Sequence, residues 1–277
     1  MQNSAHSTIS STTWDADFAD RSPIFEPLRA VAARLRGPHW PTLDKLQWLA
    51  SEPPTLETLS GMPLSIVRED RSWSLGFEAR AYLHGELQVR TTNWHDLFNV
   101  LAWRVFPRAK AAINRAHYEA LPEARDGRRG ARRDALTLFD ESGVIVAASD
   151  PALLDAVREF RWRELFVERR AELADQLRCV VFGHALYEKA LAPYVGLTGH
   201  AVLLEVSADT IALDAASLVE RLDAELAMRL DDAAAFTAAG FAPFPLLGMP
   251  GWWPDNADAA FYDNQRYFRP GRARSAS

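Results

Sequence analysis

Three histidines of this 277-residue chain stand among apolar residues, where an imidazole can act as a base or as a metal ligand. The first, His95, lies in the segment NWHDLFN at residues 93–99. The pattern predicts a helix that is apolar nearly all round and is therefore buried. On that helix His95 and Asn99 lie one turn apart, so Asn99 could orient the imidazole or a substrate. A hydrogen-bonded core histidine is the alternative, since burial demands a partner but not a reaction.

The residues around this histidine also have structural explanations. Asn93 is placed to cap the helix, which makes Asp96 the third helical residue, an arrangement typical of capping. His117 lies close to the apolar face of a second helical segment, where a lone histidine is more often structural. His184 follows a glycine at a strand-to-helix junction. Glu188 comes one helical turn later, a spacing that can share a proton or a metal.

A carboxylate partner for these imidazoles is expected at Asp134. This residue follows two arginines and begins a predicted hairpin, with strands over residues 135–139 and 144–148 joined by an Asp-Glu-Ser-Gly turn. In a regular strand Asp134 and Asp140 share one sheet face, because they are an even number of residues apart. A salt bridge with the neighbouring arginines is the structural alternative.

The first function hypothesis is a hydrolase with a His/Asp site. Its catalytic residues would be His95 as the base, Asn99 as the orienting amide, Asp134 as the carboxylate and His184 as a second imidazole. If the site is metal-dependent, a divalent metal would be held by His95, His117 and Asp134. No serine-nucleophile elbow, zinc-binding motif or phosphate-binding loop is present in the sequence.

Two alternatives come from other functional classes. Trp252, Trp253, Phe261 and Tyr262 could line a groove, which would make the protein a non-catalytic module that binds a small molecule, a peptide or a protein. These rings could equally bury themselves in the core. A weaker alternative is RNA or DNA contact through the arginine loop at residues 125–133. The net charge of -6 disfavours a nucleic-acid partner and leaves an unidentified small molecule as the expected one.

Composition restricts the compartment in which the protein is expected to work. The single cysteine, Cys179, cannot form an intramolecular disulfide, and a buried unpaired cysteine usually behaves as a small hydrophobe. No stretch approaches ~18 consecutive apolar residues, so no transmembrane helix is predicted. No basic start followed by an apolar run indicates a signal peptide. These features predict a cytoplasmic protein without membrane association, and they leave its oligomeric state open.

The order of elements predicts an α+β fold, a helix-rich single domain with short mixed or antiparallel strands, because strands and helices do not alternate regularly. The domain would span residues 21–270, between disordered tails at 1–20 and 271–277. Alternation over residues 77–83 predicts a strand. Pro107 should split the long helical region after residue 93 into two helices. Further strands are expected at 179–182 and 201–206, and further helices at 184–191 and 214–230.

Four groups of segments carry a family resemblance. They are NWHDLFNVLAWRVFPRAKAAIN, RRDALTLFDESG, VFGHALYEKAL with GLTGHA, and PFPLLGMPGWWPDNADAAFYDN with YFRP. In combination, over nearly the whole chain from about residue 25 to 270, they resemble an uncharacterised bacterial family, the domain of unknown function numbered three thousand and twenty-five. The resemblance implies a small cytoplasmic proteobacterial protein and supplies no activity.

Overall fold

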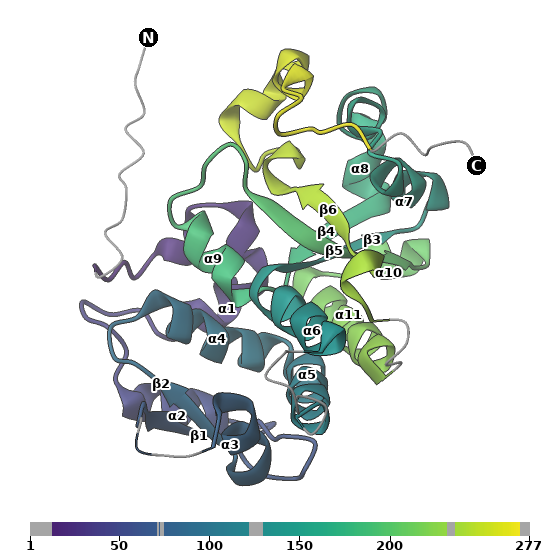
Figure 1. Ribbon diagram of the computed structural model, residues 1–277. Helices are drawn as coiled ribbons and strands as arrows, with labels where there is room; N and C mark the ends of the chain where they lie inside the picture. Colours follow the sequence, from purple (N-terminus) through teal and green to yellow (C-terminus); the bar gives the residue numbers. More distant parts are fainter. Residues whose placement is uncertain (1–12, 71, 73–74, 122–129, 232–235, 272–277) are drawn as a thin grey trace.

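Two sheets and a set of short helices make up the fold (Figure 1). The computed structural model describes residues 13–70, 72, 75–121, 130–231 and 236–271. The larger sheet lies between helices on both of its faces, and the smaller sheet lies among helices of the N-terminal half. This arrangement confirms the predicted α+β class with short strands of mixed direction.

The larger sheet consists of β3 (Gly143–Ala148), β4 (Leu177–Val181), β5 (Thr198–Glu205) and β6 (Ala242–Pro245). Its order is β4-β3-β5-β6, with β3 parallel to β5 and the other two pairs antiparallel. Every residue of β3 is buried, which fits a central strand with small and β-branched side chains. Alternate β3 side chains enter two hydrophobic cores, Val144 and Val146 on one face and Ile145 and Ala147 on the other.

Helices cover both faces of this sheet. Helix α7 (Pro151–Arg158) packs on the face of Val144, and α11 (Ala215–Asp231) packs with α5 (Pro107–Glu119) and α6 (Ala131–Ser142) on the other. In Figure 1 the strands lie to the left of α7 and above α11. The remaining helices and single turns are η1 (Phe18–Asp20), η2 (Pro23–Leu28), α1 (Arg29–Ala33), α2 (Leu43–Ser51), α3 (Phe77–His84), α4 (Trp94–Val105), η3 (Glu164–Glu168), α8 (Arg170–Gln176), α9 (His184–Ala190), α10 (Ala208–Ile211), η4 (Ala238–Gly240), η5 (Leu246–Gly248), η6 (Pro254–Ala257) and η7 (Ala259–Asp263).

The long helical region divides where the sequence predicts. The Asn93 side chain accepts a hydrogen bond from the Asp96 backbone N–H at 3.0 Å and caps α4, as the sequence predicts. Phe106 leaves the helical conformation, and Pro107 begins α5 at the position where its missing N–H does no harm. The strands expected at 179–182 and 201–206 are also confirmed, as β4 and β5.

The strand predicted over residues 77–83 is wrong, because these residues form α3. This helix connects β1 (Ser65–Arg68) to β2 (Glu86–Val89), and these two strands run parallel in the smaller sheet. Parallel neighbours require a crossover connection, which a hairpin cannot provide. Gly85 ends the helix with a positive φ of 70°, the left-handed conformation typical of a helix C-terminus.

The predicted hairpin is wrong in its first strand. Residues 135–139 belong to helix α6, and the second strand is β3, which pairs with β4 and β5 instead. Leu136 and Phe139 are buried at helical spacing, so the apolar pattern fits a helix as well as it fits a strand. The Asp-Glu-Ser-Gly segment is the end of this helix, and Asp134 and Asp140 therefore do not share a sheet face.

Residues 13–20, which the sequence assigns to a tail, pack on the rest of the described chain. Phe18 is fully buried in the larger core, and Trp14 donates from Nε1 to the Gly37 carbonyl at 2.9 Å. The Trp14 ring also stacks on Trp94 at a centroid distance of 5.2 Å. Two aromatic side chains thus anchor a segment whose polar composition predicts a tail. The rest of the predicted tails, residues 1–12 and 272–277, lies outside the described residues.

No helix in the described ranges is long and apolar enough to cross a lipid bilayer.

One glycine brings the end of α6 against the start of α9. A Cβ atom added to Gly183 would lie 2.5 Å from both the Glu141 carbonyl oxygen and the Ser142 backbone nitrogen. We expect Gly183→Ala to lower the free energy of unfolding by about 1–3 kcal/mol, because rigid backbone rather than a flexible side chain must move. Urea denaturation of both proteins measures this difference.

The matched control is Gly37→Ala, since an added Cβ there meets nothing within 4 Å. Equal stability of the two variants would show that the contact at Gly183 is not tight.

Candidate functional site

A polar cleft of about 600 Å³ opens beside the start of α4. Residues from α3, α4, α5, α6 and α9 line it, so it collects side chains that are far apart in the sequence. Four of the predicted site residues are among them: His95, Asn99, His117 and His184. The cleft is therefore the place where the polar groups singled out in the sequence converge.

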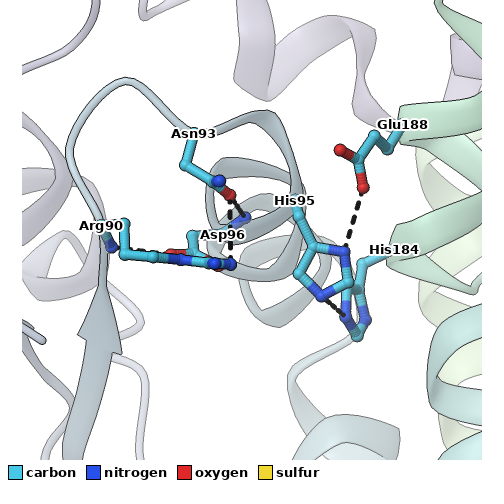
Figure 2. Close-up of polar contacts among 6 residues, drawn as sticks. All are labelled: Arg90, Asn93, His95, Asp96, His184 and Glu188. Atoms are coloured by element: carbon cyan, nitrogen blue, oxygen red, sulfur yellow. Dashed lines mark hydrogen bonds and ion pairs between the residues drawn. The ribbon is translucent and has the colours of Figure 1, made fainter. Parts of the chain in front are cut away.

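Two of these imidazoles touch. Figure 2 shows the His95 ring between Glu188 and His184. The two Nε2 atoms are 3.1 Å apart, and the ring planes meet edge to face at 73°. On its other side, His95 Nδ1 lies 3.1 Å from Glu188 Oε2. Each nitrogen of His95 thus has one polar partner, a carboxylate on one side and an imidazole on the other.

The first turn of α4 holds His95 in this position. Arg90 binds Asp96 through its backbone N–H and its guanidinium, with Nη2–Oδ1 at 2.8 Å (Figure 2). The Asn93 cap closes the same turn. His184 begins α9, and this helix packs directly on α4. Both histidines therefore stand at helix starts that local hydrogen bonds and packing fix in place.

A buried ion pair lies behind His184. Its Nδ1 is 3.6 Å from Asp140 Oδ2, a distance for charge interaction rather than a hydrogen bond. Asp140 Oδ1 accepts from Lys110 Nζ at 2.5 Å, and the two side chains are 12% and 4% exposed. Lys110 also donates to Asn99 Oδ1 at 2.8 Å. Because Lys110 occupies Oδ1, the amide nitrogen Nδ2 of Asn99 is the group that can donate to a molecule in the cleft.

Burial sets the charges of these groups. It lowers the pKa of His184 to about 3, helped by the nearby Lys110 and His95 and opposed by Asp140, so this imidazole is neutral at physiological pH. Burial alone would raise the pKa of Asp140, but Lys110 and then His184 outweigh it and hold that pKa below its usual value. Asp140 is therefore a carboxylate at neutral pH.

The row Glu188, His95 and His184 contains two contacts of hydrogen-bond length. Two neutral imidazoles supply one N–H each, so both contacts can be hydrogen bonds. In that arrangement His95 donates from Nδ1 to Glu188 and accepts at Nε2 from His184 Nε2.

Glu78 is a cleft residue that the sequence does not reveal, because residues 77–83 read as a strand. Its carboxylate accepts from Asn114 Nδ2 at 2.7 Å. Burial and the negative charge of Asp140 raise the pKa of Glu78 to about 7. The cleft therefore holds a carboxyl group that can give up or take a proton near neutral pH.

Asp134 is not part of this site. It is exposed on α6, and Asp140, six residues later, is the carboxylate that reaches His184. Six residues correspond to about 240° around a helix, so the two carboxylates point to different sides. The predicted metal ligands His95, His117 and Asp134 are therefore not brought together. Among the described residues, no three His, Cys, Asp or Glu side chains are grouped to hold a metal ion.

Residues 65–272 match the family described as "Protein of unknown function (DUF3025)". The chain belongs to this family. No curated protein and no solved structure matches the sequence or the fold. The matched range includes every cleft residue discussed above, from Glu78 to His184, and the Glu188 partner of His95, so the site belongs to the DUF3025 region.

The other sequence features of this DUF3025 chain lie elsewhere. Tyr262 is buried, and its hydroxyl donates to the Gly248 carbonyl at 2.9 Å. Trp252, Trp253 and Phe261 pack partly buried against the same core, so these rings contribute to packing. Of the arginines proposed for nucleic acid, residues 125, 128 and 129 lie outside the described residues, Arg132 is on α6, and Arg133 lines the cleft.

The Lys110–Asp140 pair of the DUF3025 site makes a testable contribution to stability. Lys110→Met leaves a buried carboxylate without its cation, and we expect a loss of about 3–5 kcal/mol in the free energy of unfolding. The double variant Lys110→Met/Asp140→Asn should recover most of this loss, because neither charge remains. Urea denaturation at pH 7 measures both, and additive losses in the double variant would contradict the pairing.

Glu78 should make stability fall as pH rises. Its pKa is raised on folding, from an ordinary 4.5 to about 7, so the folded protein favours the protonated carboxyl. Stability is full below about pH 4.5 and declines as the pH rises through 7, by at most ~3 kcal/mol. Glu78→Gln should remove this decline, which denaturation at pH 5 and pH 8 measures. The exposed Glu168→Gln should leave the native pH dependence in place.

Proposed function

We propose that the cleft is the active site of a hydrolase that works by general acid–base catalysis on a small polar molecule. The observation that supports this most is the 3.1 Å contact between His95 and His184, with a carboxylate beyond each ring. A histidine backed by a carboxylate is the arrangement that raises the basicity of an imidazole and steadies its charged form.

His95 is the proposed base. Its side chain is 32% exposed, so a water molecule can reach it from the cleft, whereas His184 is 6% exposed. His95 would exchange its Nε2 contact with His184 for that water and take a proton from it at Nε2, and the resulting hydroxide would attack the substrate. The Glu188 carboxylate accepts the Nδ1–H of the resulting imidazolium and stabilises its charge.

Two further groups complete the proposed chemistry. Asn99 Nδ2, whose orientation Lys110 fixes through Oδ1, would donate to the oxygen on which negative charge develops. Glu78, with a pKa of about 7, would protonate the leaving group. A base and an acid with separate environments in one cleft are what such a reaction needs.

The size and setting of the cleft define the expected substrate. A volume of about 600 Å³ suits a small molecule rather than a polymer. The compartment that we propose is the bacterial cytoplasm, since Cys179 is unpaired and burial raises the pKa of its thiol, which makes it unreactive. Binding without catalysis is the alternative function for the same cleft.

The test is loss of activity in His95→Ala. Purified protein is incubated with an extract of small metabolites and with a panel of chromogenic esters and amides, and consumed compounds are identified by mass spectrometry. We expect a compound that the native protein converts and that His95→Ala converts about 10²–10⁴-fold more slowly. His39→Ala, at an exposed histidine outside the cleft, should keep full activity.

Two outcomes would contradict the proposal. A compound that is retained but never converted would indicate a binding protein. Equal turnover by native protein and His95→Ala would remove the base from its role. Elemental analysis of the same preparations shows whether a divalent metal is bound, and loss of a bound metal in His95→Ala would assign this histidine as a ligand.

A further inference from the structure

The larger sheet has an incompletely paired edge. β5 is eight residues long, but β6 pairs only with its first half, Thr198–Ala201. The chain before Ala242 departs from β5 into η4. The second half of β5 is therefore paired on one side only, with β3.

The direction of the backbone groups follows from the ladder. The Val206 N–H donates to the Ala148 carbonyl of β3, so Leu204 and Val202 also turn their N–H and C=O groups towards β3. Leu203 and Glu205 then turn theirs the opposite way. No described residue pairs with these backbone groups, which makes them a template for another strand.

The largest of the clefts described here, about 740 Å³, lies directly beside this stretch. Val202 and Leu203, whose side chains point to opposite faces of the sheet, both line it, as a cleft at a sheet edge requires. Phe160, just beyond α7, lies on one side of it, and Met228 of α11 lies on the other. Met228 is 60% exposed. A strand placed here could bury alternate apolar side chains on both sides.

On the α11 side, the charges that line this cleft favour a carboxylate of the partner, whereas Glu205 lies at the end of β5 outside the lining. Arg158 binds Asp155 at 2.6 Å, and Glu225 binds Arg221 at 2.6 Å, so these two lining residues are neutralised locally. The exposed Arg229 of α11 also lines the cleft. Among the described lining residues it therefore gives the cleft a net positive charge. A carboxylate is the group that complements it.

We propose that this edge binds an extended peptide segment of a partner protein, which adds as a strand beside Leu203 and Glu205 and places a carboxylate at Arg229. Main-chain hydrogen bonds would supply affinity, and the cleft would select alternate apolar side chains. This surface is separate from the cleft of His95, so it stands independently of the proposed hydrolase activity.

The experiment selects ligands from a display library of short random linear peptides against the full chain. We expect enrichment of sequences with alternating apolar residues and an acidic residue or a free C-terminal carboxylate. A selected peptide, synthesised and titrated by fluorescence anisotropy, should bind about tenfold more weakly to Arg229→Glu. It should bind normally to Arg266→Glu, a matched charge reversal at an exposed arginine outside this cleft.

Two further measurements test the strand geometry itself. The same peptide is methylated at alternate backbone nitrogens in each of the two possible registers. It should lose binding in one register, because only the N–H groups on one side of the added strand pair with the edge. Hydrogen exchange should slow at the Leu203 and Glu205 amides when the peptide is bound. The proposal is overturned if no peptide is enriched, if methylation leaves binding unchanged, or if sedimentation shows that a second copy of the chain covers this edge.

Discussion

The ion pair between Lys110 and Asp140 is the contact on which the rest of the site depends. It joins α5 to α6 with little solvent access, and its two members then reach outward to Asn99 and His184. A buried pair of this kind is stable only when its geometry and remaining hydrogen bonds are well satisfied. The charges of Lys110 and Asp140 thus orient two cleft residues, and the packing of α5 against α6 must keep the two charges together.

The sequence predicts helix limits correctly where capping residues and prolines mark them. Asn93 and Pro107 predict the two ends of α4, and the apolar run around Val202 predicts β5. The failures are two short segments, 77–83 and 135–139, whose apolar spacing suits either period. Tertiary context decided both: a parallel β1–β2 pair needs a helix between its strands, and β3 found partners other than the preceding segment.

The same failures explain which site residues sequence reasoning missed. His95, Asn99, His117 and His184 do converge on one cleft, because each stands on a helix that was predicted as a helix. The sequence points to Asp134 because this residue begins the expected strand beside two arginines, whereas Asp140 falls in the expected turn. In helix α6 it is Asp140 that reaches His184. Glu78 had no signal at all, and Lys110 resembles any other lysine until its burial against Asp140 is seen. The role of a buried charged residue can be recognised only from the residues around it in the folded structure.

The N-terminal segment has an optical consequence. The ring centroids of Trp14, Trp40 and Trp94 are 4.8 to 5.2 Å apart, close enough for the electronic transitions of the three indoles to couple. Trp94 is covalently joined to His95 and belongs to the same helical turn. The coupled band in the near-ultraviolet circular dichroism spectrum is thus an intrinsic reporter on the conformation of the residue beside it, readable without any label or substrate.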